Sequence, residues 1–259
     1  MLQYRYSALS LLALALAVPG VALSQPGVSG KLSPQESSWT QTSPEGAALQ
    51  SELFSRAEAE RRAARLGGLQ LHDALARVAT RHAIDMAERG YAADVTPEGL
   101  SLLDQIRKTD RQTLYSAFGA NIAIVEAGAE ADALHRLLMS DKANAANLLR
   151  PGFGHMGIGA VEKDGRLYLV QLMARVEGEL IQPLPVNARP ADSLKATYAS
   201  SMMAPVSWSI SDAEGVTLLR GAGQTLRQTS GRPVEGYLNL DVSVGPDIYS
   251  LRGPFVRVD

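Results

Sequence analysis

Histidine and carboxylate side chains are the groups through which this chain could transfer protons or hold a metal ion, because it has four histidines and no cysteine. His82 lies in an apolar helical pattern, which favours a core histidine hydrogen-bonded to the backbone over a ligand. His155 comes at the expected start of a strand, which favours a surface or edge role. His72 and His135 are expected on the surfaces of helices or loops. Each histidine therefore has a structural interpretation that competes with a catalytic one.

Asp94 precedes a turn-like sequence, Thr-Pro-Glu-Gly, at residues 96–99. An aspartate in such a place commonly accepts a hydrogen bond from the backbone two residues on, which favours a structural role. The competing hypothesis is a catalytic site drawn from four ionisable residues, Asp94, Glu98, His155 and His82. Such a site requires its groups to converge within about 3 Å of a common point in a pocket.

Helices are predicted to position most of these groups. Apolar residues recur at helical spacing from Leu49 to Ala64, and Gly67-Gly68 ends this pattern. A second helix is predicted to begin with Asp73 as its cap and to end at Gly90, with His82 on its apolar face. Shorter helices are expected at about residues 100–108 and 131–139.

The chain then changes from a helical to an alternating pattern. Residues 156–161 and 167–174 read as two strands around Asp164-Gly165, a dipeptide favoured in tight hairpin turns. The second strand is apolar on both faces, which fits a central strand covered by helices on both sides. Helices followed by a buried hairpin indicate an α+β layered domain.

The last part of the chain has a different character. Residues 178–193 form a proline-rich stretch that is expected to be a stiff, extended linker. Residues 194–259 contain short alternating strands, which predict a small all-β domain, an antiparallel sandwich or barrel. The expected strands lie at residues 206–210, 216–219, 225–228, 238–244 and 248–251. Two separately folded units are therefore predicted.

Composition and charge exclude some partners. The chain of 259 residues is 46% apolar and 20% charged, as expected of a folded protein. Its net charge of -2 produces no field that favours nucleic acid or an anionic membrane. The basic residues of one helix alternate with glutamates, which indicates a solvated face rather than a binding patch. These basic residues are Arg56, Arg61, Arg62 and Arg65.

The N-terminus has the pattern of an export signal. Arg5 precedes an uncharged run at residues 7–18, and Ala22-Leu23-Ser24 carries the small residues that a signal peptidase reads. A signal peptide at residues 1–24 is predicted, followed by a flexible segment at residues 25–45. The apolar run is shorter than the roughly 20 residues that span a bilayer, so no transmembrane anchor is expected after cleavage. Without cysteine, neither a lipoprotein anchor nor a disulfide is available.

Three motifs in the chain resemble the bacterial branch of the CAP superfamily, which comprises the cysteine-rich secretory proteins, antigen 5 and the plant pathogenesis-related proteins. Bacterial members usually read G-E-N-I-A, G-H-R-x-N-I-L-N-P and I-G-x-G. The matching stretches are Gly119-Ala120-Asn121-Ile122-Ala123, residues 144–151 and Gly157-Ile158-Gly159. The resemblance covers residues 46–177 and implies an α-β-α sandwich there.

The resemblance also implies a cleft without its usual ligands. Where the family carries a His, a Glu and a His that can hold a divalent cation, this chain has Asp94, Ala120 and Asn144. A methyl group donates nothing and an amide oxygen is a weak neutral ligand, so one carboxylate among neutral groups is a poor metal site. No catalytic residue, metal or cofactor is therefore expected. The possible accessory groups are Glu98, Asn121, Asn147 and His155.

The sequence leaves three functions open. The favoured one is a periplasmic or secreted bacterial protein that binds or scaffolds without catalysis, with an unknown protein, glycan or apolar ligand in the cell envelope or outside the cell as its partner. The alternatives are a hydrolase with a rearranged cleft site and a carrier of a lipid or another apolar ligand. Nucleic acid is not expected as a partner.

Overall fold

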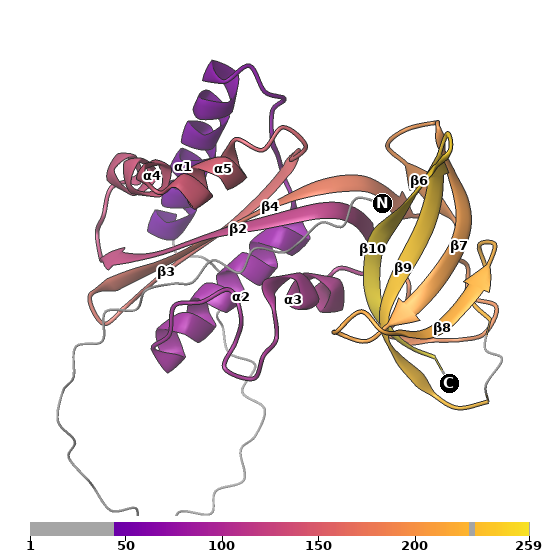
Figure 1. The fold of residues 1–259 in the computed structure, drawn as a ribbon. Coiled ribbons are helices and arrows are strands. Elements are labelled where there is room, and N and C mark those ends of the chain that lie inside the picture. Colours follow the sequence, from indigo (N-terminus) through magenta and orange to yellow (C-terminus); the bar gives the residue numbers. More distant parts are fainter. Residues whose placement is uncertain (1–43, 228–230, 259) are drawn as a thin grey trace, which may run out of the picture. The chain divides into compact units, whose positions relative to one another are not determined.

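The computed structural model describes residues 44–227 and 231–258 of the chain (Figure 1). The predicted signal peptide and nearly all of the predicted flexible segment, residues 25–45, lie outside the described residues. The described elements all belong to one compact unit.

The first two thirds of the chain contain all the helices of the described ranges. In chain order the elements are α1 (Pro44–Ala63), β1 (Gln70–Leu71), α2 (Asp73–Arg89), α3 (Leu102–Thr109), β2 (Thr113–Glu126), α4 (Ala131–Ser140), α5 (Lys142–Leu148), β3 (His155–Lys163) and β4 (Arg166–Leu180). Strands alone follow: β5 (Asn187–Ala188), β6 (Ala196–Tyr198), β7 (Met203–Ser211), β8 (Thr217–Ala222), β9 (Val234–Val244) and β10 (Asp247–Val258).

The strands of the described residues form one mixed sheet. Its order is β1-β3-β4-β2-β10-β9-β7-β8, with β5 paired to β10 and β6 paired to β4. The β2-β4 and β3-β4 pairs are antiparallel, and the short β1 runs parallel to β3. Within the sheet, β2 meets β10 at one antiparallel pair, Tyr115 with Arg252, and β4 meets β6 at three pairs.

Strand β4 is buried on both faces, as the apolar residues on its two faces predicted. Leu167, Leu169 and Met173 join a core with α1, α4 and α5. The alternate residues, among them Val170 and Leu172, join a second core with α2 and α3. Figure 1 shows the two groups of helices on opposite sides of β2, β3 and β4. The predicted α-β-α sandwich is confirmed.

Two glycines of β3 allow α2 to lie directly on the sheet. A Cβ atom at Gly157 would stand 2.2 Å from the backbone nitrogen of Ala76, and one at Gly159 would stand 2.3 Å from the backbone carbon of Ala79. Helix backbone approaches strand backbone this closely only where no side chain intervenes. The predicted hairpin turn is also present, since Asp164 and Gly165 both have positive φ, 52° and 73°.

Strands β7, β8, β9 and β10 pair antiparallel, as predicted, and surround their own core, while the short β5 runs parallel to β10. That core contains Trp208 of β7 with apolar residues of β8, β9 and β10. A strand was expected at residues 225–228. Within its described part, residues 225–227, Thr225 makes only an isolated bridge to Ser193 and no strand forms.

The segment expected to be a linker is packed rather than extended through solvent. Strand β4 continues to Leu180, and Leu184 and Ala188 are buried in the same core as Trp208. The physical reason is the apolar residues between the prolines, which contribute side chains to that core. Separate folding of residues 46–177 and 194–259 stays a prediction.

Arg107 ties α3 to the C-terminal strands. Its guanidinium donates to the carbonyl oxygens of Gly253 at 2.7 Å and Leu238 at 2.5 Å, and to Oδ1 of Asn239 at 2.9 Å. It also lies 4.7 Å from the centre of the Tyr237 ring. Burial lowers the pKa of Arg107 to about 10, so the group remains a cation at neutral pH.

The prediction of a solvated basic face on α1 is wrong for Arg61, which is fully buried. Its guanidinium donates to four backbone carbonyls, those of Gly67, Leu148, Arg150 and Phe153. These carbonyls lie at the end of a helix and in turns, where no backbone N–H of a following helical turn can bond them. The Arg61 guanidinium donates to all four. Arg61 therefore fixes the end of α5 and the turn before β3.

Candidate functional site

The three positions matched to the cleft lie on three separate elements. Asp94 is exposed in the loop between α2 and α3, and Asn144 lies in α5. Ala120 of β2 packs against the core of α2 and α3. Within the described residues the Asp94 carboxylate has no hydrogen bond or ion pair. The backbone oxygen of Asp94 accepts from Leu102, so the capping bond predicted for its side chain is not formed.

Glu98 is engaged by other surface residues. Its carboxylate accepts two bonds from Arg89, which also donates to Asp85 at 2.8 Å. The bonds from Arg89 lower the pKa of Glu98 to about 2. The structure thus places Glu98 in an exposed ion pair, and this pair does not include Asp94.

The amides of the motif residues form what we call the amide network: the side chains of Asn121, Asn147 and Gln171 with the backbone oxygens of Ala120 and Asn144. Asn121 Nδ2 lies 3.1 Å from the oxygen of Asn144 and 3.5 Å from Gln171 Oε1. Asn147 Nδ2 lies 3.0 Å from the oxygen of Ala120 and 3.1 Å from Asn121 Oδ1. Asn121 and Gln171 are each only 1% exposed. The network ties β2 and β4 to α5.

The amide network has no group that titrates, because primary amides neither gain nor lose protons in the ordinary range. Gly119 makes room for it, since a Cβ there would stand 2.9 Å from Asn147 Oδ1. Two of the expected accessory residues, Asn121 and Asn147, therefore hold the scaffold together. The network leaves one donor, Gln171 Nε2, buried without a partner.

His82 is the core histidine that its helical position predicted. It is 1% exposed, and its Nε2 lies 2.7 Å from the backbone oxygen of Ala93. Because a carbonyl only accepts, Nε2 carries the hydrogen and Nδ1 accepts from Gln105 at 3.1 Å. His82 has both ring nitrogens in use as a brace between α2, the following loop and α3.

The prediction that His135 lies on a surface is wrong, whereas His72 is partly exposed. His135 is 6% exposed and contacts Glu60 of α1 at 3.3 Å through Nε2. His72, rather than Asp73, is the N-cap of α2, and its Nδ1 accepts from the backbone nitrogen of Leu75 at 3.5 Å. An imidazole nitrogen thus replaces the side-chain oxygen that usually caps a helix.

His155 is the first residue of β3, as expected, but it stands beside His72. The two ring centres are 5.7 Å apart in an edge-to-face contact. The Nδ1 atom of His155 is buried and has no partner. Burial, and secondarily the neighbouring His72, lowers the pKa of His155, which favours the neutral ring.

Asp110, the C-cap of α3, lies next to this pair. Its Oδ1 accepts from the backbone nitrogens of Gln112 and Thr113, and its Oδ2 accepts from Tyr115 Oη at 2.5 Å. Although burial opposes the charge, these bonds lower the pKa of Asp110 overall. The carboxylate Oδ2 stands 3.9 Å from Nε2 of His72. We call His72, Asp110, Tyr115 and His155 the histidine junction.

The histidine junction was not expected from the sequence. Its members come from the start of α2, the end of α3, the start of β2 and the start of β3, and no shared motif links these segments. The signals that point to it are a histidine at the first turn of α2 and the glycines of β3 on which that turn rests.

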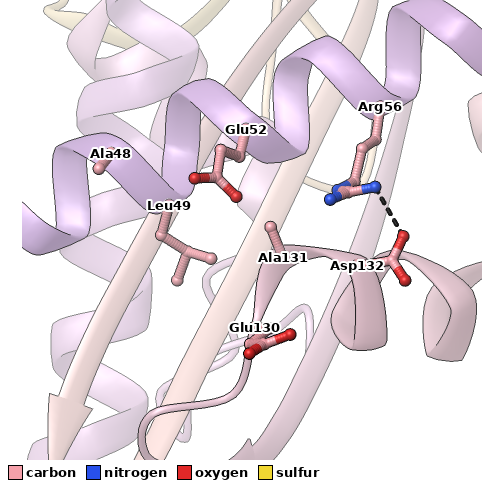
Figure 2. A pocket seen from close by; sticks show the side chains of 7 residues that line it. All are labelled: Ala48, Leu49, Glu52, Arg56, Glu130, Ala131 and Asp132. Atoms are coloured by element: carbon pink, nitrogen blue, oxygen red, sulfur yellow. Dashed lines mark hydrogen bonds and ion pairs between the residues drawn. The ribbon is translucent and has the colours of Figure 1, made fainter.

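A pocket of about 500 Å³ lies between α1 and α4 (Figure 2). Leu49 and Ala131 form its apolar part, and Glu52 of α1 and Glu130, the residue before α4, face it. An ion pair of Arg56 with Asp132, 2.6 Å long, lies at one side. The lining therefore carries three carboxylates and one guanidinium, and it contains none of the residues matched to the cleft.

The donor set at the matched positions does not fit a metal ion. Ala120 offers a methyl group and Asn144 an amide, which leaves Asp94 as the single charged ligand. Within residues 44–227 and 231–258, no group of three or more His, Cys, Asp or Glu side chains is arranged to hold a metal ion.

Comparison with known proteins places the helical part of the chain. Residues 55–173 match CAP, the cysteine-rich secretory protein family. An outer surface protein of Borrelia burgdorferi is 18% identical over 50% of this chain and 94% of its own, with a TM-score of 0.46.

Two further solved structures are similar to the chain. An extracellular protein of Bacillus anthracis that contains an SCP domain is 22% identical over 57% of this chain and 45% of its own, with a TM-score of 0.42. A cysteine-rich secretory protein of Staphylococcus aureus is 19% identical over 52% of this chain and 41% of its own, with a TM-score of 0.39. No curated protein matches the chain.

Proposed function

Because residues 55–173 form a domain of the CAP family, we propose that this protein is an exported CAP protein that binds or scaffolds a partner without catalysing a reaction. The observation that carries the proposal is the chemistry of the matched cleft positions. Ala120 and Asn144 cannot transfer a proton, and the Asp94 carboxylate has no partner group within the described residues. Asp94 therefore lacks a matched partner for general acid and base catalysis at these positions.

The amide network supports the same proposal. It holds β2, β4 and α5 together through groups that do not titrate. The frame of the domain thus persists independently of the chemistry, as expected of a domain retained as a binding surface. The partner is a protein, a glycan or an apolar ligand of the cell envelope or the extracellular space.

Export is the second part of the proposal. It rests on the signal pattern before Gln25 and on the family, whose name describes secreted proteins. No helix in the described parts of the chain is long and apolar enough to cross a membrane. Amino-terminal sequencing of material from the native host should give Gln25 as the first residue. A start at Met1 in a soluble cytoplasmic fraction would contradict export.

Zinc binding tests the proposal at the cleft. A ligand present at a hundred times its dissociation constant stabilises a folded protein by about 2.7 kcal/mol. In a domain of this size each kcal/mol raises the melting temperature by roughly 2 to 4 °C. We expect zinc at tens of micromolar to shift the melting temperature by less than about 1 °C.

A designed variant provides the positive control. Ala120→Glu, Asn144→His and Asp94→His together restore the family's ligand types and should create a zinc-dependent shift of several degrees. The matched control, Ala120→Gln with Asn144→Gln and Asp94→Asn, keeps similar size and polarity without restoring those ligands and should show no shift. A large shift in the unmodified protein that Asp94→Ala or His155→Ala abolishes would reject the non-catalytic proposal.

The hydrolase alternative has one observation in its favour. The structure brings His155 together with His72 and Asp110, whereas Glu98 and His82 are bonded to other partners. A hydrolase would therefore act through the histidine junction. Hydrolysis of ester or peptide substrates that Asp110→Asn and His155→Gln both abolish would establish this alternative.

A further inference from the structure

We propose that the histidine junction is a pH-sensitive latch in which protonation of His72 releases the first turn of α2. Two roles meet in one ring. His72 Nδ1 caps α2 by accepting from Leu75, and its Nε2 lies 3.3 Å from Thr113 Oγ1. Because Nδ1 accepts, the hydrogen of the neutral ring is on Nε2.

The only place for an added proton on His72 is therefore the capping nitrogen. Protonated Nδ1 is a donor and faces the Leu75 N–H, which is also a donor, so the cap is lost. An imidazolium at this end of a helix is further opposed by the positive end of the helix dipole. Acid thus removes the bond that closes the first turn of α2.

Asp110 offers the protonated His72 ring an alternative partner. Its carboxylate is held ionised by two backbone donors and Tyr115, and Oδ2 is 3.9 Å from His72 Nε2. A small displacement of the ring away from Leu75 brings an imidazolium into hydrogen-bonding distance of Oδ2. The Thr113 hydroxyl, which also helps to lower the pKa of Asp110, lies between the two groups.

His155 blocks the alternative of protonating both rings. Its Nδ1 is buried without an acceptor, and its ring edge contacts His72. Two charged imidazoles at this distance repel one another, so the pair takes up one proton. The other ionised groups that act here are Glu179 of β4, which favours the proton on His155, and Arg111, which faces Asp110.

The position of the latch gives its release a structural effect. The first turn of α2 rests on Gly157. Residues just after Asp110 bind the end of β4 and the segment beyond it, since the backbone oxygen of Gln112 accepts from Leu180 and that of Arg111 accepts from Leu184. Release of His72 therefore loosens contacts between α2, β2 and β3 at the point where the C-terminal strands attach.

Amide hydrogen exchange of the full chain at pH 7.5 and pH 5.5 tests the latch. After correction for the intrinsic pH dependence of exchange, we expect protection at residues 75–78 to fall about five- to tenfold at pH 5.5, as expected for loss of an N-cap. Protection in α5, which is capped by the Asp141 carboxylate, should not fall with it. Absence of the fall at residues 75–78 would overturn the proposal.

The variant His72→Asn separates titration from folding. Asparagine caps helices well and does not titrate, so protection of α2 should be retained at pH 7.5 and change less than about twofold at pH 5.5. The control His135→Gln removes another buried histidine and should leave the response intact. An unchanged response in His72→Asn, a lost response in His135→Gln, or an Nδ1–H tautomer of His72 in nitrogen-detected spectra at pH 7.5 would each overturn the latch.

Discussion

The amide network and the histidine junction lie on opposite faces of the same sheet and answer differently to protons. Asn121 and Gln171 lie on the face of β2 and β4 that contacts α1, α4 and α5, whereas Tyr115 lies in the core with α2 and α3. The first cluster contains amides alone. The second contains two imidazoles, a phenol and a carboxylate within one set of contacts.

The difference shows that this domain keeps its framework contacts and its titratable groups in separate places. The amide network belongs to the motif residues, and it holds the strands to α5 at any ordinary pH. The histidine junction lies outside those motifs, and there the structure places two imidazoles beside a carboxylate and a phenol. A motif match therefore locates the stable part of the domain and not its proton-sensitive part.

The largest expected effect comes from a change that shifts α2, and with it the histidine junction, but does not touch the amide network. In Gly157→Ala the new Cβ collides with the backbone of α2, so the helix must shift and carry His72 away from His155. We expect a loss of about 3 kcal/mol or more in the free energy of unfolding, measured by chemical denaturation. Gly154→Ala, where a Cβ meets nothing within 4 Å, should cost less than about 0.5 kcal/mol. Equal losses in the two variants would contradict this packing.

The next effect breaks the amide network. Asn121→Ala removes the donor to the oxygen of Asn144 and the acceptor of Asn147. Buried groups left unpaired should destabilise the protein by about 2 to 3 kcal/mol, which lowers the melting temperature by roughly 4 to 12 °C. The loss should be the same at pH 5 and pH 8. Asn144→Ala is the control, because within the described residues the Asn144 side chain makes no hydrogen bond, and a loss above about 0.5 kcal/mol there would be unexpected.

Asp110→Asn should remove about 1 to 3 kcal/mol at pH 7, because Tyr115 then meets an amide in place of a carboxylate. The pKa of Asp110 is lowered in the folded state, so its charge stabilises the protein above the unfolded pKa of about 3.9 and this contribution is lost as the pH falls. The gap between Asp110→Asn and the unmodified protein should therefore narrow below about pH 4. Urea titrations at pH 7 and pH 3 would show a constant gap if the charge had no role.

The smallest expected effect is on the pH dependence of stability that His155 contributes, which the amide network does not share. Because the folded-state pKa of His155 is lowered, the unmodified protein should lose stability as the pH falls through about 6.5, the unfolded value. His155→Gln should remove this part of the pH dependence, by less than about 1 kcal/mol since part of the ring reaches solvent. Melting temperatures at pH 7.5 and pH 5.5 measure the difference. A steeper loss in the variant would show that the sign is wrong.

Sequence reasoning was sufficient where the controlling interaction is local. The two apolar faces of β4, the turn at Asp164 and the core position of His82 follow from residue spacing within one segment. The long strand β2 was not predicted, because Gly119, Ala120 and Asn121 at its centre have weak strand propensity. Strand β2 is stabilised by its pairing with β4 and β10, which the propensity of its residues does not reveal.

The candidate site was predictable in part. The sequence pointed to Asp94, Ala120 and Asn144 but not to β2 and α5, the elements that carry the last two, and whether the three residues act together stays untested. The roles of His72 and Arg61 were missed because most of their partners are distant in sequence: the carboxylate of Asp110 for the first, and the carbonyls of Leu148, Arg150 and Phe153 for the second. Packing gives such roles to single residues near the ends of helices. The local spacing of apolar residues does not reveal these roles.

Arg107 sets an order of events for the growing chain. It lies in α3, but the oxygens that receive its guanidinium belong to residues 238, 239 and 253. A ribosome must therefore complete well over a hundred further residues before this charge finds its partners. Until then the inner face of α3 carries a solvated cation, which opposes premature burial of that face. A chain that ends before β9 lacks the acceptors of Arg107. The face of α3 that carries this cation then stays exposed, and an exposed helix face is more open to proteolysis.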